Sequence, residues 1–181
     1  MIPRLYLAGK IGQNDWRHAL IPGLRDHSWA DGPLDAVAFE YVGPFFVACD
    51  HGCFHGPNGH GMRNGCAPIG FAHKRIIRLN LAAIHNADLV FAYITSSDCY
   101  GTLFELGWAA RGGKRIVIAF APGIDHLDFW FSAKQVAATH KGVTPEALPA
   151  LLKVEITKTQ TTLVLGGAGS FGKAHNRKNY G

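Results

Sequence analysis

Two carboxylates, Asp98 and Glu105, are the residues whose surroundings best suit chemistry. They follow a continuous apolar run at 89–94, which is typical of a strand buried on both faces. A helical pattern and a second apolar run at 115–121 complete a β-α-β unit, which crosses over right-handed in a parallel sheet. Ligands of such sheets bind beyond the carboxyl ends of the strands. We therefore expect both carboxylates to line a site, where an ionised, oriented carboxylate suits a nucleophile.

Glu105 also has a purely structural explanation. The pattern Thr102-x-x-Glu105 is a capping box, in which Thr102 begins the helix and the glutamate satisfies a free amide there. Backbone amides and the helix dipole would favour the ionised form of a carboxylate at that position. The capping and catalytic explanations do not exclude each other, and spacing alone leaves both open.

The chain contains the stretches YLAGKI, NADLVFAYI, DCYGTLFELGWA and GKRIVI. Together they resemble the signature of the nucleoside 2-deoxyribosyltransferase family over roughly residues 3–120. The most specific part is the core G-T-x-x-E-x-G-x-A, formed by Gly101, Thr102, Glu105, Gly107 and Ala109. The resemblance implies cleavage or transfer at the N-glycosidic bond of a nucleoside or nucleotide through a covalent glycosyl-Glu105 intermediate. No cofactor is expected, because a carboxylate can itself stabilise an oxocarbenium-like transition state.

The same resemblance implies roles for individual residues. Glu105 would be the nucleophile, Asp98 would bind a sugar hydroxyl, and Tyr6 would position the glutamate. Asp50 and His51 resemble the start of the loop that covers the base and sugar in the family. The predicted substrate-binding residues are Gly9, Lys10, Asp50, His51, Asn80, Gly101 and Thr102.

Three of these positions have arguments of their own. Gly9 and Lys10 end the first predicted strand and would border the pocket, where Lys10 either meets a phosphate or is simply exposed. Asn80 stands where the family usually carries an aspartate that helps protonate the leaving base. An amide can hydrogen-bond a base but cannot give it a proton at neutral pH. Either Asp50 or a histidine supplies that proton, or the activity is altered or lost.

The segment 49–66 is rich in cysteine, histidine and glycine, and a metal site is the alternative to a pocket loop there. Its possible zinc ligands are Cys49, Cys53, His55, His60 and Cys66. This spacing is not one of the usual zinc patterns, so we predict a loop without metal near the pocket. A disulfide is not expected in a cytoplasmic chain.

Composition bounds the class of protein. The chain has 181 residues, of which 48% are hydrophobic and 17% charged, as in an ordinary soluble α/β domain. Its net charge of +5 suits an anionic ligand such as a nucleotide but is too diffuse to indicate nucleic-acid binding. Neither a membrane span nor a signal-peptide pattern is present, so the expected location is the cytoplasm.

We predict a single Rossmann-like or flavodoxin-like domain over 1–165, with a mainly parallel sheet flanked by helices, and a basic flexible tail over 166–181. Strands are also expected at 3–9, at 36–48 with an interruption at Gly43-Pro44, and at 162–165, and helices at 73–85 and 145–154. Asp15 is expected to cap a short helical turn, and Asp125 or Asp128 another helix.

The stretch DFWF at 128–131 resembles the segment through which neighbouring subunits of the family complete each other's pockets, so a homo-oligomer is expected. Two other functions fit the same residues. The core YGTLFE also resembles nucleoside 5′-monophosphate phosphoribohydrolases, although Asp98-Cys99-Tyr100 stands where their motif has glycines. A non-catalytic nucleotide-binding or sensor module fits Asn80 and the basic charge. A phosphate loop at 167–173 is rejected, because Ala174 replaces the required hydroxyl residue.

Overall fold

The computed structural model describes residues 2–11, 15–24, 32–36, 38–44 and 73–167. Its centre is a six-stranded sheet in the order β2-β3-β1-β4-β5-β6. Five strands run parallel, and β2 pairs antiparallel with β3 at one edge. The predicted α/β class with a mainly parallel sheet is confirmed. The strands are β1 (Arg4–Ala8), β2 (Leu34–Asp35), β3 (Glu40–Gly43), β4 (Leu89–Ile94), β5 (Arg115–Phe120) and β6 (Ala138–His140).

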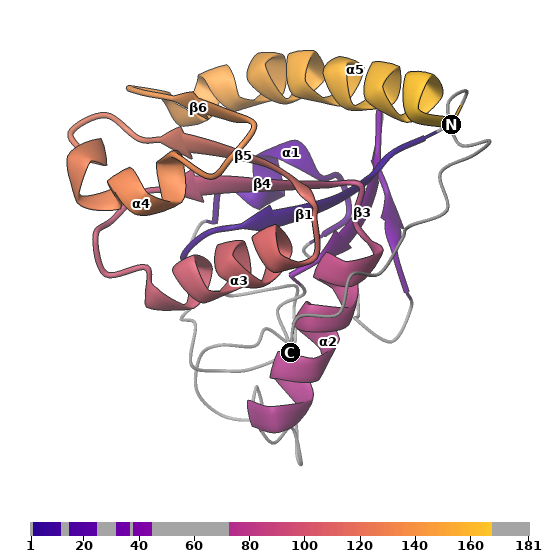
Figure 1. Ribbon diagram of the computed structural model, residues 1–181, viewed down its shortest axis with the longest axis horizontal. Coiled ribbons are helices and arrows are strands. Elements are labelled where there is room, and N and C mark those ends of the chain that lie inside the picture. The colour runs from indigo at the N-terminus through magenta and orange to yellow at the C-terminus, as the bar shows by residue number, and fades with distance from the viewer. Residues whose placement is uncertain (1, 12–14, 25–31, 37, 45–72, 168–181) are drawn as a thin grey trace, which may run out of the picture.

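Helices cover both faces of the sheet (Figure 1). The α-helices are α1 (Arg17–Leu20), α2 (His73–Asn86), α3 (Tyr100–Arg111), α4 (Trp130–Ala133) and α5 (Leu148–Gly167), and the 3-10 turns are η3 (His126–Phe129) and η4 (Pro145–Ala147). The predicted helix at 73–85 is confirmed as α2. None of the described helices combines the length and the apolar character needed to cross a membrane.

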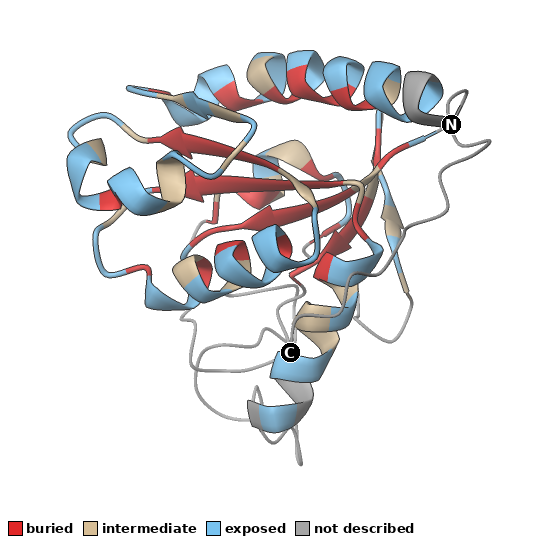
Figure 2. Cartoon of the chain, in the orientation of Figure 1, coloured by how far each residue is buried: buried red, intermediate tan, exposed pale blue. Residues whose placement is uncertain are grey.

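Strand β1 shows how the sheet divides the core. Leu5 and Leu7 face the layer formed by α1 and α5, whereas Tyr6 and Ala8 face the layer formed by α2 and α3. Successive side chains of a strand point to opposite faces, so a strand in the middle of a two-faced core must be apolar throughout. Figure 2 shows the resulting band of buried residues along the central strands.

The strand order reverses between β1 and β4. After β1 the chain forms β2 and β3 on one side of β1, and it then crosses to β4 on the other side. In open α/β sheets the carboxyl ends of the strands at such a switch point form the usual ligand crevice. Lys10 and Asp98, which follow β1 and β4, lie at this edge.

The predicted strand at 36–48 is confirmed only as β3, which ends at the interruption that Gly43-Pro44 predicted. Gly43 has a φ of 143°, and a Cβ there would lie 3.2 Å from the Tyr6 ring. Residues 45–48 lie outside the described residues.

The predicted strand at 162–165 is wrong, because the helix expected at 145–154 continues as α5 to Gly167. Threonines that favour strands are accommodated in α5, since the hydroxyls of Thr157, Thr159, Thr161 and Thr162 donate to the carbonyl four residues earlier. The predicted flexible tail therefore begins inside a helix, and residues 168–181 lie outside the described residues.

A buried carboxylate, Glu155, fastens α5 to the sheet. Its side chain is fully buried and lies 2.9 Å from Arg115 Nη2 and 2.6 Å from Lys158 Nζ, with His140 Nε2 at 3.5 Å. Burial raises the pKa of Glu155, but hydrogen bonds from Lys158 and Arg115 outweigh it and hold the pKa below its ordinary value. The charged form of Glu155 thus stabilises the fold.

We expect Glu155→Gln to lower the free energy of unfolding by about 2 kcal/mol at neutral pH, because Arg115 and Lys158 lose their buried partner. The folded pKa of Glu155 lies below the unfolded value, so this contribution is present above the unfolded pKa and lost as pH falls through the folded pKa. Urea unfolding at neutral and acid pH measures the difference between variant and wild type. The exposed Asp35→Asn is the control and should change stability by less than about 0.5 kcal/mol. An equal loss at both pH values would contradict the electrostatic explanation.

Candidate active site

An ion pair joins the carboxyl ends of β1 and β4 at the switch point. Lys10 Nζ lies 2.5 Å from Asp98 Oδ2, and Ser96 Oγ donates to Asp98 Oδ1 at 2.5 Å. Both charged side chains are about half exposed, at 48% for Lys10 and 56% for Asp98. Hydrogen bonds from Lys10 and then from Ser96 hold the pKa of Asp98 below its ordinary value. Asp98 therefore presents an ionised carboxylate at the edge where ligands of this architecture bind.

Glu105 reaches back from α3 to the centre of the sheet. The hydroxyl of Tyr6, which is fully buried in β1, donates to Glu105 Oε1 at 2.6 Å. Burial raises the pKa of Tyr6 and the nearby Glu105 charge raises it further, so the phenol keeps its proton and remains a donor. The phenol thus holds one carboxylate oxygen, Oε1. The resemblance implied this pair, and the structure brings the two side chains into contact.

The capping box predicted at Thr102 is wrong. Helix α3 begins at Tyr100, and its N-cap is Cys99, whose side chain makes no capping hydrogen bond. Thr102 is instead buried within the helix, and Glu105 lies beyond the first turn. A capping role therefore does not account for Glu105. Helix α3 ends at Arg111 with Gly112 as its C-cap, and Gly113 follows with a φ of 65°.

The protonation of Glu105 also differs from the expectation for a helix start. Burial raises its pKa above the ordinary value, while the hydrogen bond from Tyr6 and the charge of Arg17 oppose that rise. The difference follows from the position of Glu105 in α3. The unpaired backbone amides and the helix dipole act within the first turn of a helix, and Glu105 lies beyond that turn. Its charged form thus depends on side chains from other elements.

One of these side chains, Arg17, was missed by sequence reasoning. The Arg17 guanidinium is fully buried; Nε donates to Leu7 O at 2.7 Å, and Nη2 to Gly9 O at 2.8 Å. Nη1 donates to both oxygens of Asp15, at 2.9 and 2.8 Å. Asp15 Oδ1 also accepts from the Arg17 amide, although the N-cap of α1 is Trp16 rather than Asp15. The sequence feature that could have indicated this ion pair is the spacing of Asp15 and Arg17, two residues apart in the segment that follows the first strand.

Trp16 packs between Tyr93 and Arg17. Its ring meets Tyr93 edge-on with centroids 5.4 Å apart, and the Arg17 guanidinium lies 4.5 Å from the Trp16 ring centroid. Gly9 is required beside them: its φ is 148°, and a Cβ would lie 2.7 Å from the carbonyl oxygen of Tyr93. No other residue fits there without a backbone shift.

The remaining predicted site residues lie on other elements or outside the described part of the chain. Gly101 lies exposed in the first turn of α3, and Asn80 is half-buried on α2. Asp50, His51 and the possible zinc segment at 49–66 lie outside the described residues. Among the described residues, no group of three or more His, Cys, Asp or Glu side chains could hold a metal ion.

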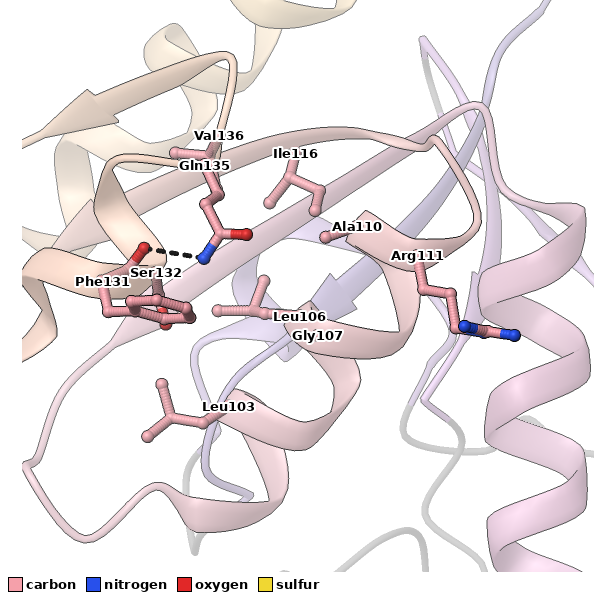
Figure 3. Close-up of a pocket in the computed structure, with 10 residues that line it drawn as sticks. All are labelled: Leu103, Leu106, Gly107, Ala110, Arg111, Ile116, Phe131, Ser132, Gln135 and Val136. Atoms are coloured by element: carbon pink, nitrogen blue, oxygen red, sulfur yellow. Dashed lines mark hydrogen bonds between the residues drawn. The ribbon is translucent and has the colours of Figure 1, made fainter. Parts of the chain in front are cut away.

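A separate groove of about 580 Å³ lies between α3 and α4 (Figure 3). Leu103, Gly107 and Ala110 line it from α3, and Phe131 and Val136 close the other side. At 3.6 residues per turn, these α3 positions point away from the flank that carries Glu105. The groove therefore does not belong to the Tyr6–Glu105 site.

Comparison with known families places this site in context. A family model described as nucleoside 2-deoxyribosyltransferase like matches residues 2–122. The chain belongs to this family. The match spans β1 to β5 and includes Tyr6, Asp98 and Glu105, whereas α4, β6 and α5 lie beyond it. A comparison with curated proteins returned no match. Membership of the deoxyribosyltransferase-like family indicates an enzyme that processes nucleosides.

We expect Tyr6→Phe to raise the pKa of Glu105 further, because the variant loses the hydrogen bond that favours the charged carboxylate. It should also lower the free energy of unfolding by about 1 kcal/mol. Carbon-13 NMR titration of the glutamate side chains, with Glu105→Gln to assign the signal, measures the pKa.

The matched control is Tyr93→Phe, which removes a buried hydroxyl bound to Val143 O at 2.8 Å on the opposite face of the sheet. It should cost similar stability without moving the Glu105 signal. A Glu105 titration that is the same in both variants would show that the Tyr6 contact does not influence its charge.

Proposed function

We propose that the protein cleaves the N-glycosidic bond of a nucleoside or nucleotide, with Glu105 as the nucleophile. The observation that carries the proposal is the 2.6 Å hydrogen bond from the buried Tyr6 to a glutamate that does not cap its helix. A carboxylate oriented in this way beside the ligand crevice suits attack on an anomeric carbon. Membership of the deoxyribosyltransferase-like family supports the same reaction class.

The reaction has two steps. Glu105 Oε2 attacks C1′ of the sugar as the bond from C1′ to the base nitrogen breaks, and that electron pair leaves with the base. Tyr6 holds Oε1 and spreads the charge of the attacking carboxylate. Water or a second base then attacks C1′ and gives up a proton to the group that protonated the first base, while the ester bond to Glu105 breaks and the carboxylate is regenerated. Water gives hydrolysis, and a second base gives transfer.

Asp98 is proposed to bind a sugar hydroxyl. It is ionised, and its Lys10 and Ser96 partners hold it at the switch-point edge near the start of α3. Lys10 is paired with Asp98, so a phosphate on the substrate would have to share or displace that contact. Gly9, Gly101 and Thr102 are proposed to shape the same edge.

The leaving base needs a proton in neutral solution. Asn80 can hydrogen-bond the base but cannot supply the proton. Tyr6 and Tyr41 are poor acids here, since burial raises the pKa of each. We propose that Asp50 or a histidine, outside the described residues, supplies it.

We expect Glu105→Gln to reduce release of free base by on the order of 10³-fold or more, the scale seen when a nucleophile is removed. Chromatography of free base, after incubation with mixed nucleosides and 5′-monophosphates, measures it. Glu40→Gln is the control, because Glu40 is an ion-paired glutamate 2.7 Å from Arg4 at the opposite end of β1. Turnover by Glu105→Gln equal to that of Glu40→Gln would refute the mechanism.

The same assay separates the alternatives. Adding a second free base distinguishes transfer, which produces a new nucleoside, from hydrolysis. Cleavage that requires a 5′-phosphate would favour the phosphoribohydrolase. Saturable ligand binding without any base release from wild type would favour the non-catalytic sensor module.

We further propose that the protein forms a homo-oligomer through the outer side of α3, η3 and α4. Three neighbouring apolar side chains are exposed there: Leu127 at 64%, Trp130 at 61% and Phe131 at 66%. Phe129, in contrast, is buried against Phe120 with ring centroids 5.5 Å apart. Clustered exposed aromatic residues mark contact surfaces more often than free surface.

We expect Phe131→Asp to lower the oligomer mass, because a charge is placed where an apolar contact is proposed. Light scattering after size exclusion measures the mass. Val154→Asp is the control, since Val154 is 51% exposed on α5, away from this surface. An unchanged mass in Phe131→Asp, or a wild-type monomer, would contradict the proposal.

A further inference from the structure

Gly101 is a glycine that the structure of α3 itself does not require. It lies exposed in the first turn of the helix, and its φ is not positive. No atom of the described residues lies within 4 Å of a Cβ built at Gly101. Gly9 differs in both respects, because its φ is 148° and a Cβ there would lie 2.7 Å from the carbonyl oxygen of Tyr93. A glycine in a helix costs stability relative to alanine, so neither backbone conformation nor packing accounts for Gly101.

Gly101 lies on the same flank of α3 as Glu105. Residues four apart on an α-helix share a face, and each side chain leans back toward the N-terminal turn. The half-buried side chain of Glu105 therefore lies over the turn that contains Gly101. Trp108, three residues beyond Glu105, borders the same flank with a large side chain that is 41% exposed. Of these two neighbours, only Gly101 leaves room beside Glu105.

This room lies toward the crevice at the carboxyl ends of the strands. Helix α3 begins shortly after β4, so its first turn lies at that edge and Glu105 lies one turn further in. Asp98, which is held by Lys10 and Ser96, precedes the helix at the same edge. Gly101 therefore stands between the proposed ligand of a sugar hydroxyl and the proposed nucleophile.

We propose that Gly101 is a specificity-determining residue: its missing side chain leaves the room in which the sugar ring of the substrate lies, with C1′ at Glu105 and a hydroxyl at Asp98. This inference rests on the proposed glycosidic function. A nucleophile attacks C1′ from the face opposite the leaving base, so the sugar turns that face toward α3. A side chain at position 101 would meet this face and hold C1′ away from Glu105, and a displacement of about 1 Å can cost on the order of 10²-fold in rate.

The test measures release of free base and thermal stability in two variants of the full chain, Gly101→Ala and Gly101→Leu. Alanine and leucine both favour helix, so each variant should melt about 2 °C above wild type. We expect kcat/KM for base release to fall about tenfold in Gly101→Ala and on the order of 10²-fold in Gly101→Leu, because the larger side chain fills more of the room. A purely structural role of Gly101 would not produce a protein that is more stable and less active.

The matched control is Gly107→Ala. Gly107 is exposed in the same helix, and no atom of the described residues lies within 4 Å of a Cβ built there, but it lines the groove on the side of α3 away from Glu105. Gly107→Ala should gain similar stability and keep the kcat/KM of wild type. An equal loss of activity in Gly101→Ala and Gly107→Ala would overturn the inference, and if Gly101→Leu fails to fold, Gly101→Ala decides alone.

A comparison of substrates identifies the part of the substrate that lies over Gly101. Purine and pyrimidine nucleosides should lose activity to the same extent in Gly101→Ala, because they share the sugar. A loss confined to one class of base would place the base there and overturn the inference. If wild type releases no base, the proposed function fails and this inference with it; if wild type releases base and the Gly101 variants match it, only the place of the sugar fails.

Discussion

The hydrogen bond from Tyr6 to Glu105 is the contact on which the site depends. It can form only because β1 lies in the middle of the sheet and sends Tyr6 toward the layer that contains α3. The buried Thr102, Leu106 and Ala109 hold the inner side of α3 against the strands. Glu105, on the flank of that helix, therefore meets the phenol at a fixed place. A buried donor on a rigid strand orients a carboxylate with little loss of conformational entropy on binding.

Burial and charge oppose each other at this place. Burial favours the protonated form of the Glu105 carboxyl, whereas a nucleophile must be ionised. Burial has the larger effect and raises the pKa of Glu105, while the hydrogen bond from Tyr6 and the charge of Arg17 oppose only part of that rise. Asp98 lies in a different environment. It is about half exposed, and its hydrogen bond with Lys10 lowers its pKa, so it is ionised without a contact from a buried side chain. The two carboxylates thus have different environments and are suited to different tasks.

The last part of the chain lies beyond the family match yet completes the fold. Leu148, Leu152 and Ile156 of α5 belong to the same core cluster as Leu5 and Leu7 of β1. Without α5, the face of the sheet opposite the site would be exposed to water. Glu155 adds a specific attachment, because it binds Arg115 at the start of β5. The strand that carries Tyr6 is thus packed from behind by a helix outside the matched region.

The sequence by itself determined the α/β class, the strands β1, β4 and β5, and helix α2, and it identified Glu105 as the main catalytic candidate. Those features are local: an uninterrupted apolar run, helical spacing or a short motif records them. The start of α3 and the helix at 162–165 were not predicted, because turn and strand preferences are weak and yield to context: α5, which packs on the sheet at Leu148, Leu152 and Ile156, continues as a helix through 162–165. Only the tertiary structure brought the Arg17 guanidinium to the carbonyls of Leu7 and Gly9 at the end of β1. That proximity follows from the order of strands and helices in space, which no spacing along the chain records.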